Sequence, residues 1–181
     1  MKLNLKQALE LVEIKRPKFD SARVRGLYSF MYEAYEGDSA AAEYENARNR
    51  FGLEHVVGLA CVDYGTDTLG LSFQMADSIV GNNFGELAQA VRDGAIDPDD
   101  SELTATKSPI NHFFIGSVFN VVGRAHHAGT FAWFHDAILR EVLKGDENGV
   151  HSDHRLLGVH MIDATTVYRL VKTRMLKGLG I

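Results

Sequence analysis

Seven of the eight histidines of this 181-residue chain follow position 111. Histidine changes its charge near neutral pH and is the commonest side chain to bind metal ions. The C-terminal half is therefore where the sequence favours a metal-dependent or acid–base site. The seven are His112, His126, His127, His135, His151, His154 and His160.

A lone histidine, a His–Asp pair and a distant aspartate follow one another in this half. They are His112, His135, Asp136 and Asp163. We expect three separate helices to carry them. This order, together with the short apolar segments around it in residues 110–170, resembles the metal-binding signature of the HD-domain phosphohydrolases. In that family two histidines and two aspartates hold a divalent ion that activates water, so the resemblance implies hydrolysis of a nucleotide or phosphoester.

These four residues, two histidines and two aspartates, suit such an ion. Mn, Fe and Zn accept imidazole and carboxylate ligands, and a bound metal makes water a nucleophile near pH 7. Members of the family that cleave nucleotides usually have an acidic pair shortly after the His–Asp motif, but Leu139 and Arg140 stand there. Glu141 is the acid that remains nearest for an acid or base role. The resemblance thus implies a divalent metal cofactor, and without it we expect no cofactor.

Other histidines have plainer interpretations. His55 stands alone in an apolar run and is expected to be a hydrogen-bonded core residue. His151 and His154 are one helical turn apart, which fits zinc binding if further ligands come from elsewhere, or the polar start of a helix.

Charge and cysteine content exclude other classes of protein. The net charge of −5 and the scattered lysines and arginines give no basis for nucleic-acid binding. Cys61, the single cysteine, cannot form an internal disulfide and lies in an apolar run, as a buried, inert thiol would. No apolar run is long enough to span a bilayer, and the first residues do not resemble a signal peptide. We expect no membrane contact and a cytoplasmic location, or the host cytoplasm or virion if the protein is viral.

Apolar spacing of three and four residues predicts a mainly α fold. We expect a single compact domain of about seven to nine helices around an apolar central helix that starts at Ile110, followed by a last helical stretch from about Ser152. Residues 53–64 fit a buried strand or a buried helix equally, so one short strand pair near 53–72 is possible. Residues 1–94 form an N-terminal helical half, residues 95–107 an acidic loop and residues 108–181 a C-terminal helical half.

Aromatic residues on the predicted second helix, which starts at Ser21, suggest an interface. Tyr28, Tyr32 and Tyr35 lie off its apolar stripe, as at many protein interfaces, although a broad buried face would explain them equally. The sequence shows no complete catalytic constellation, no cofactor loop and no charge pattern for nucleic acid. It therefore favours a non-catalytic protein that docks to a protein partner or to copies of itself, such as a viral assembly component or an inhibitor of a host protein.

Overall fold

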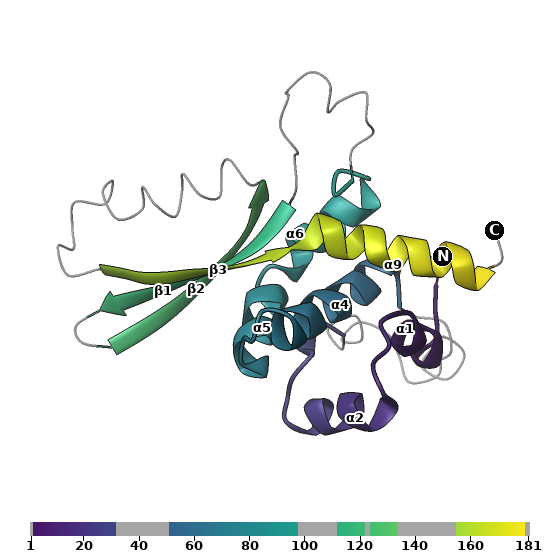
Figure 1. Cartoon of the computed structure of the whole chain (residues 1–181), viewed down its shortest axis with the longest axis horizontal. Coiled ribbons are helices and arrows are strands. Elements are labelled where there is room, and N and C mark those ends of the chain that lie inside the picture. Colours follow the sequence, from purple (N-terminus) through teal and green to yellow (C-terminus); the bar gives the residue numbers. More distant parts are fainter. Residues whose placement is uncertain (1, 32–50, 98–111, 122–123, 134–154, 180–181) are drawn as a thin grey trace, which may run out of the picture.

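The computed structural model describes residues 2–31, 51–97, 112–121, 124–133 and 155–179 (Figure 1). Its helices form one body, and a sheet extends from one side of that body (Figure 1). In chain order the elements are α1 (Leu5–Leu11), α2 (Arg16–Val24), a 3-10 turn (Ser29–Met31), α4 (Leu53–Asp67), α5 (Phe73–Gly81), α6 (Phe84–Arg92), β1 (His112–Val121), β2 (Arg124–Trp133), β3 (Arg155–Asp163) and α9 (Ala164–Leu179).

Helix α4 is the centre of the helical body. It contacts α1, α5, α6 and α9, and its buried residues lie on most of its circumference. Small residues let its neighbours come close: a Cβ added at Gly65 would lie 3.0 Å from Ile162 Cδ1. Residues 53–64 belong to helix α4, so the strand pair considered near 53–72 is wrong.

The expected central helix at Ile110 is also wrong. Residues 112–121 form strand β1, which pairs antiparallel with β2 from His112–Trp133 to Val121–Arg124. Six of the ten β1 residues are Phe, Ile or Val, residue types that favour strands. The sequence pattern is ambiguous here, because a nearly continuous run of apolar residues fits a strand as well as a buried helix.

Strand β3 completes the sheet in the order β2-β1-β3. It pairs antiparallel with β1, with a register shift between Val118 and Phe119. The last helical stretch, expected from about Ser152, therefore begins only at Ala164. Asp163 caps it: Oδ1 accepts a hydrogen bond from the Thr166 N–H and Oδ2 one from the Thr166 hydroxyl, each at 2.9 Å.

The described part of the chain is mainly helical, as expected, but contains six α-helices rather than seven to nine. One hydrophobic core joins residues from both ends of the sequence, including Leu9, Val57 and Val167. Most of the acidic loop expected over 95–107 lies outside the described residues. Among the helices that the structure describes, none combines the length and the apolarity needed to cross a bilayer.

Candidate functional site

The structure places two of the four predicted metal ligands on strands rather than helices. His112 begins β1 and Asp163 ends β3. Because Phe113 pairs with Asp163, these two residues lie at the same end of the sheet, one register position apart. His135, Asp136 and Glu141 lie outside the described residues.

Both carboxylate oxygens of Asp163 hydrogen-bond to Thr166, so this side chain already has a structural role as a helix cap. Within the residues that the structure describes, no three His, Cys, Asp or Glu side chains gather in a way that could hold a metal ion. The metal site therefore stays a prediction.

The structure places Tyr28 in the core and not on the second helix. The second helix starts at Arg16, with Pro17 in its first turn, and ends at Val24, so Tyr28 follows it with a φ of 61°. Its side chain is fully buried (0% exposed) and stacks on Phe19 at 5.4 Å. Tyr28 is thus a core residue. Tyr32 and Tyr35 lie outside the described residues.

The expectations for His55 and Cys61 are confirmed. His55 is buried against the rings of Phe51 and Phe84, and its Nδ1 accepts a hydrogen bond from the Gly52 N–H at 3.2 Å. Cys61 is fully buried in α4, and burial, with a contribution from the charge of Asp163, raises the pKa of its thiol. A protonated, buried thiol is unreactive.

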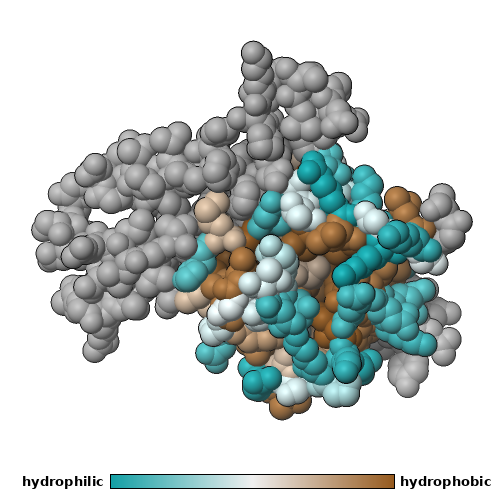
Figure 2. Space-filling model, viewed as in Figure 1, coloured by the Kyte–Doolittle hydropathy of each residue, from teal (hydrophilic) through white to brown (hydrophobic). Residues whose placement is uncertain are grey.

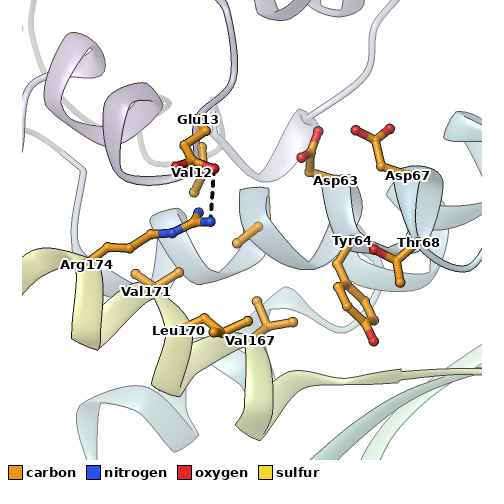
Figure 3. Close-up of a pocket in the computed structure, with 11 residues that line it drawn as sticks. Val12, Glu13, Asp63, Tyr64, Asp67, Thr68, Val167, Leu170, Val171 and Arg174 are labelled. Atoms are coloured by element: carbon orange, nitrogen blue, oxygen red, sulfur yellow. Dashed lines mark hydrogen bonds and ion pairs between the residues drawn. The ribbon is translucent and has the colours of Figure 1, made fainter.

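A hollow lies where the end of α1, one face of α4 and one face of α9 meet (Figure 3). We call it the α4–α9 groove. Its volume is about 310 Å³. It is lined by Val12, Glu13, Ala60, Asp63, Tyr64, Asp67, Thr68, Val167, Leu170, Val171 and Arg174.

Each of the two helices contributes a stripe at positions i, i+3, i+4 and i+7. The α4 stripe starts at Ala60 and ends at Asp67, and the α9 stripe starts at Val167 and ends at Arg174. Such positions share one face of a helix. Between the charged ends the floor includes Val12, Val167 and Val171, but these valines are almost fully buried, so most of the surface that lines the groove is polar. Leu170 stands at the edge with half of its surface exposed (50%).

One side of the groove carries two aspartates that Lys18 of α2 bridges. The Lys18 Nζ donates to Asp63 Oδ1 at 2.7 Å and to Asp67 Oδ2 at 3.4 Å. Partial burial alone would lower the pKa of Lys18, but the hydrogen bond to Asp63 and the charges of both aspartates outweigh it and raise the pKa. Lys18 is therefore a permanent cation at neutral pH.

On the other side, Arg174 forms an ion pair with Glu13 (Figure 3). Arg174 Nη2 lies 2.9 Å from Glu13 Oε2, and Nη1 donates to the carbonyl oxygen of Leu11 at 3.2 Å. These contacts join the C-terminal half of α9 to the end of α1. The guanidinium is thus held in a fixed place at the rim.

The sequence alone did not predict the groove, although Val167, Leu170 and Val171 follow helical spacing. The signal that was present is the polar and apolar alternation on the α4 stripe, where Asp63 and Asp67 interrupt an otherwise apolar helix. The chain was compared with models of protein families, with curated proteins and with solved structures, and none of the three comparisons found a match.

Proposed function

We propose that the protein is non-catalytic and acts by docking to another protein, with the α4–α9 groove as its docking surface. The observation that carries this proposal is Leu170, a large apolar side chain that stands half-exposed at the edge of an open groove. Covering the exposed half of a leucine is worth about 1 kcal/mol. An apolar side chain surrounded by polar groups is an arrangement found at many protein interfaces.

The charged groups of the groove support binding rather than catalysis. Glu13 is paired with Arg174, and Asp63 and Asp67 are paired with Lys18. A general base needs a pKa near the working pH, and a nucleophilic lysine needs a lowered pKa. The pKa of Lys18 is raised instead.

The test is the molar mass of the protein isolated under native conditions from its natural source, measured by light scattering. We expect a species well above the 20.0 kDa of one chain. Leu170→Asp should return the protein to one chain, because a carboxylate cannot be buried against an apolar partner. Leu176→Asp is the matched control, since Leu176 lies on the same helix, is similarly exposed (41%) and does not line the groove. A 20.0 kDa wild type, or equal behaviour of both variants, would contradict the proposal.

A second candidate is the metal-dependent phosphohydrolase implied by the HD-like residues. The observation that favours it is the register, which brings His112 and Asp163 to one end of the sheet. Metal analysis of untagged wild type and His135→Ala separates the two candidates. Stoichiometric Mn, Fe or Zn in the wild type, lost in the variant, would support the enzyme. Metal-free wild type in a complex that depends on Leu170 would support docking.

A further inference from the structure

We infer that the segment docked in the α4–α9 groove belongs to a partner protein and carries a large apolar side chain with a lysine or arginine nearby. This inference rests on the proposed docking function and specifies the chemistry of the partner. It follows from three features of the groove: its charge balance, the position of Asp63, and its shape.

The groove has one carboxylate more than it has cations. Glu13, Asp63 and Asp67 face Lys18 and Arg174, which leaves a single surplus negative charge. Glu13 and Arg174 neutralise each other on one side. The surplus therefore lies on the other side, where two aspartates share Lys18.

Asp63 has an oxygen positioned for a further donor. Among the described residues, the hydrogen bond from Lys18 uses Oδ1 of Asp63. The side chain is only 24% exposed and lines the groove, so a cation that reaches Oδ2 would be partly shielded from water. Shielding strengthens a charge-assisted hydrogen bond relative to one on an open surface.

The shape favours a protein segment over a small amine. The hollow is open to solvent, and Leu170 stands half-exposed at its edge. The face of the molecule in Figure 2 shows hydrophobic residues gathered along α9 and toward α4, with hydrophilic residues around them. One large apolar side chain would cover the exposed half of Leu170, and the backbone that carries it would follow the edge. A lysine or arginine one helical turn away would then reach the acidic side.

The experiment is a selection of displayed random 16-residue peptides on the full chain, followed by measurement of Kd for the enriched peptides. We expect enrichment of peptides with a large apolar residue and a Lys or Arg three or four positions away. Leu170→Asp should weaken their binding about tenfold or more, and Leu176→Asp should not. Asp63→Asn should weaken it about fivefold, whereas the exposed control Glu86→Gln should leave it unchanged.

Lys18→Gln gives the sharpest readout, because removal of the internal cation leaves the groove with two surplus negative charges. We expect it to tighten binding of a basic peptide several-fold and to leave the same peptide with norleucine in place of lysine unchanged. A variant that merely loosens the fold would weaken both peptides. Circular dichroism of each variant before and after heating checks that it folds.

Three outcomes would overturn the inference. If binding of the peptides depends on Leu170 but changes with neither Asp63→Asn nor Lys18→Gln, the partner does not need a basic residue, and only the docking function is supported. If binding does not depend on Leu170 at all, both the basic partner and docking through the groove are contradicted. Binding of 4-methylpentylamine with the same dependence on Leu170 and Asp63 would assign the groove to a small amine instead of a protein segment.

Discussion

The backbone N–H of Tyr28 donates a hydrogen bond of 2.8 Å to Oδ1 of Asp77, a side chain buried in α5. This bond fixes the segment after α2 at the residue where the backbone takes a positive φ of 61°. The Tyr28 ring then packs edge-on against Phe73, one helical turn before Asp77. A single carboxylate thus holds the turn that brings a large aromatic residue into the core.

Substitutions at Asp77 should separate its hydrogen bond from its charge. Asp77→Ala should lower the free energy of unfolding by about 1–3 kcal/mol, because the Tyr28 N–H loses its acceptor inside the protein. Asp77→Asn retains an acceptor oxygen and should be much less harmful at pH 7. Burial raises the pKa of Asp77, so the wild-type carboxylate costs stability as the pH rises through that pKa. Urea unfolding at pH 7 checks both variants, and equal losses in the two would contradict this role.

Glu54 should account for part of the stability that the protein loses in acid. Its carboxylate lies 3.4 Å from His55 Nδ1, and the hydrogen bond from the protonated imidazole is the main cause that lowers its pKa to about 2. In this protonated form Nδ1–H donates to Glu54 and no longer accepts from the Gly52 N–H. The stabilising contribution is complete above the unfolded pKa near 4.5 and is lost as the pH falls toward 2. Its size is about 3 kcal/mol.

Unfolding of Glu54→Gln between pH 5 and pH 2 measures this contribution. The variant should be less stable than the wild type at pH 5, and the two should converge at pH 2. Glu86→Gln is the matched control, since Glu86 is an exposed acid in the first turn of α6. Parallel curves for wild type and Glu54→Gln would rule out a contribution from this pair.

A side chain at Gly65 should be costly. A Cβ there would lie 3.0 Å from Ile162 Cδ1 and 3.1 Å from Ala76 Cβ, so these neighbours would have to give way by a few tenths of an ångström. We expect Gly65→Ala to cost about 1–3 kcal/mol of unfolding free energy. Gly85→Ala in α6 meets no atom within 4 Å and should be neutral or slightly stabilising, because alanine favours helix. Thermal unfolding of the pair is the measurement, and a Gly65→Ala protein as stable as Gly85→Ala would show that the packing is looser than described.

Helices α1, α5 and α6 are predictable from local signals, because apolar residues such as Leu5, Ala8 and Leu9 recur in them at helical spacing. Helix α2 was not predicted correctly, because it starts at Arg16 and ends at Val24 instead of starting at Ser21. The cap at Asp163 has a local signal too, since aspartate is a common residue directly before a helix.

The sheet was not predicted because its signal is ambiguous. Phe113, Phe114 and Ile115 are apolar in succession, which fits a buried helix and a strand equally well. Pairing with β3, about forty residues away, decides between them. The groove depends on residues that lie even farther apart in the sequence, because Asp63 and Leu170 come together only when α9 packs on α4.

The most direct test of docking is photo-crosslinking from single positions in cells of the natural source. A photoreactive amino acid replaces Leu170 in the groove or, as the control, Val24, an apolar residue that is 87% exposed and does not line the groove. The account predicts a discrete protein adduct from position 170 and none from position 24, with the position 170 adduct reduced by Asp63→Asn. No adduct from position 170, or the same adducts from both positions, would contradict docking through the groove.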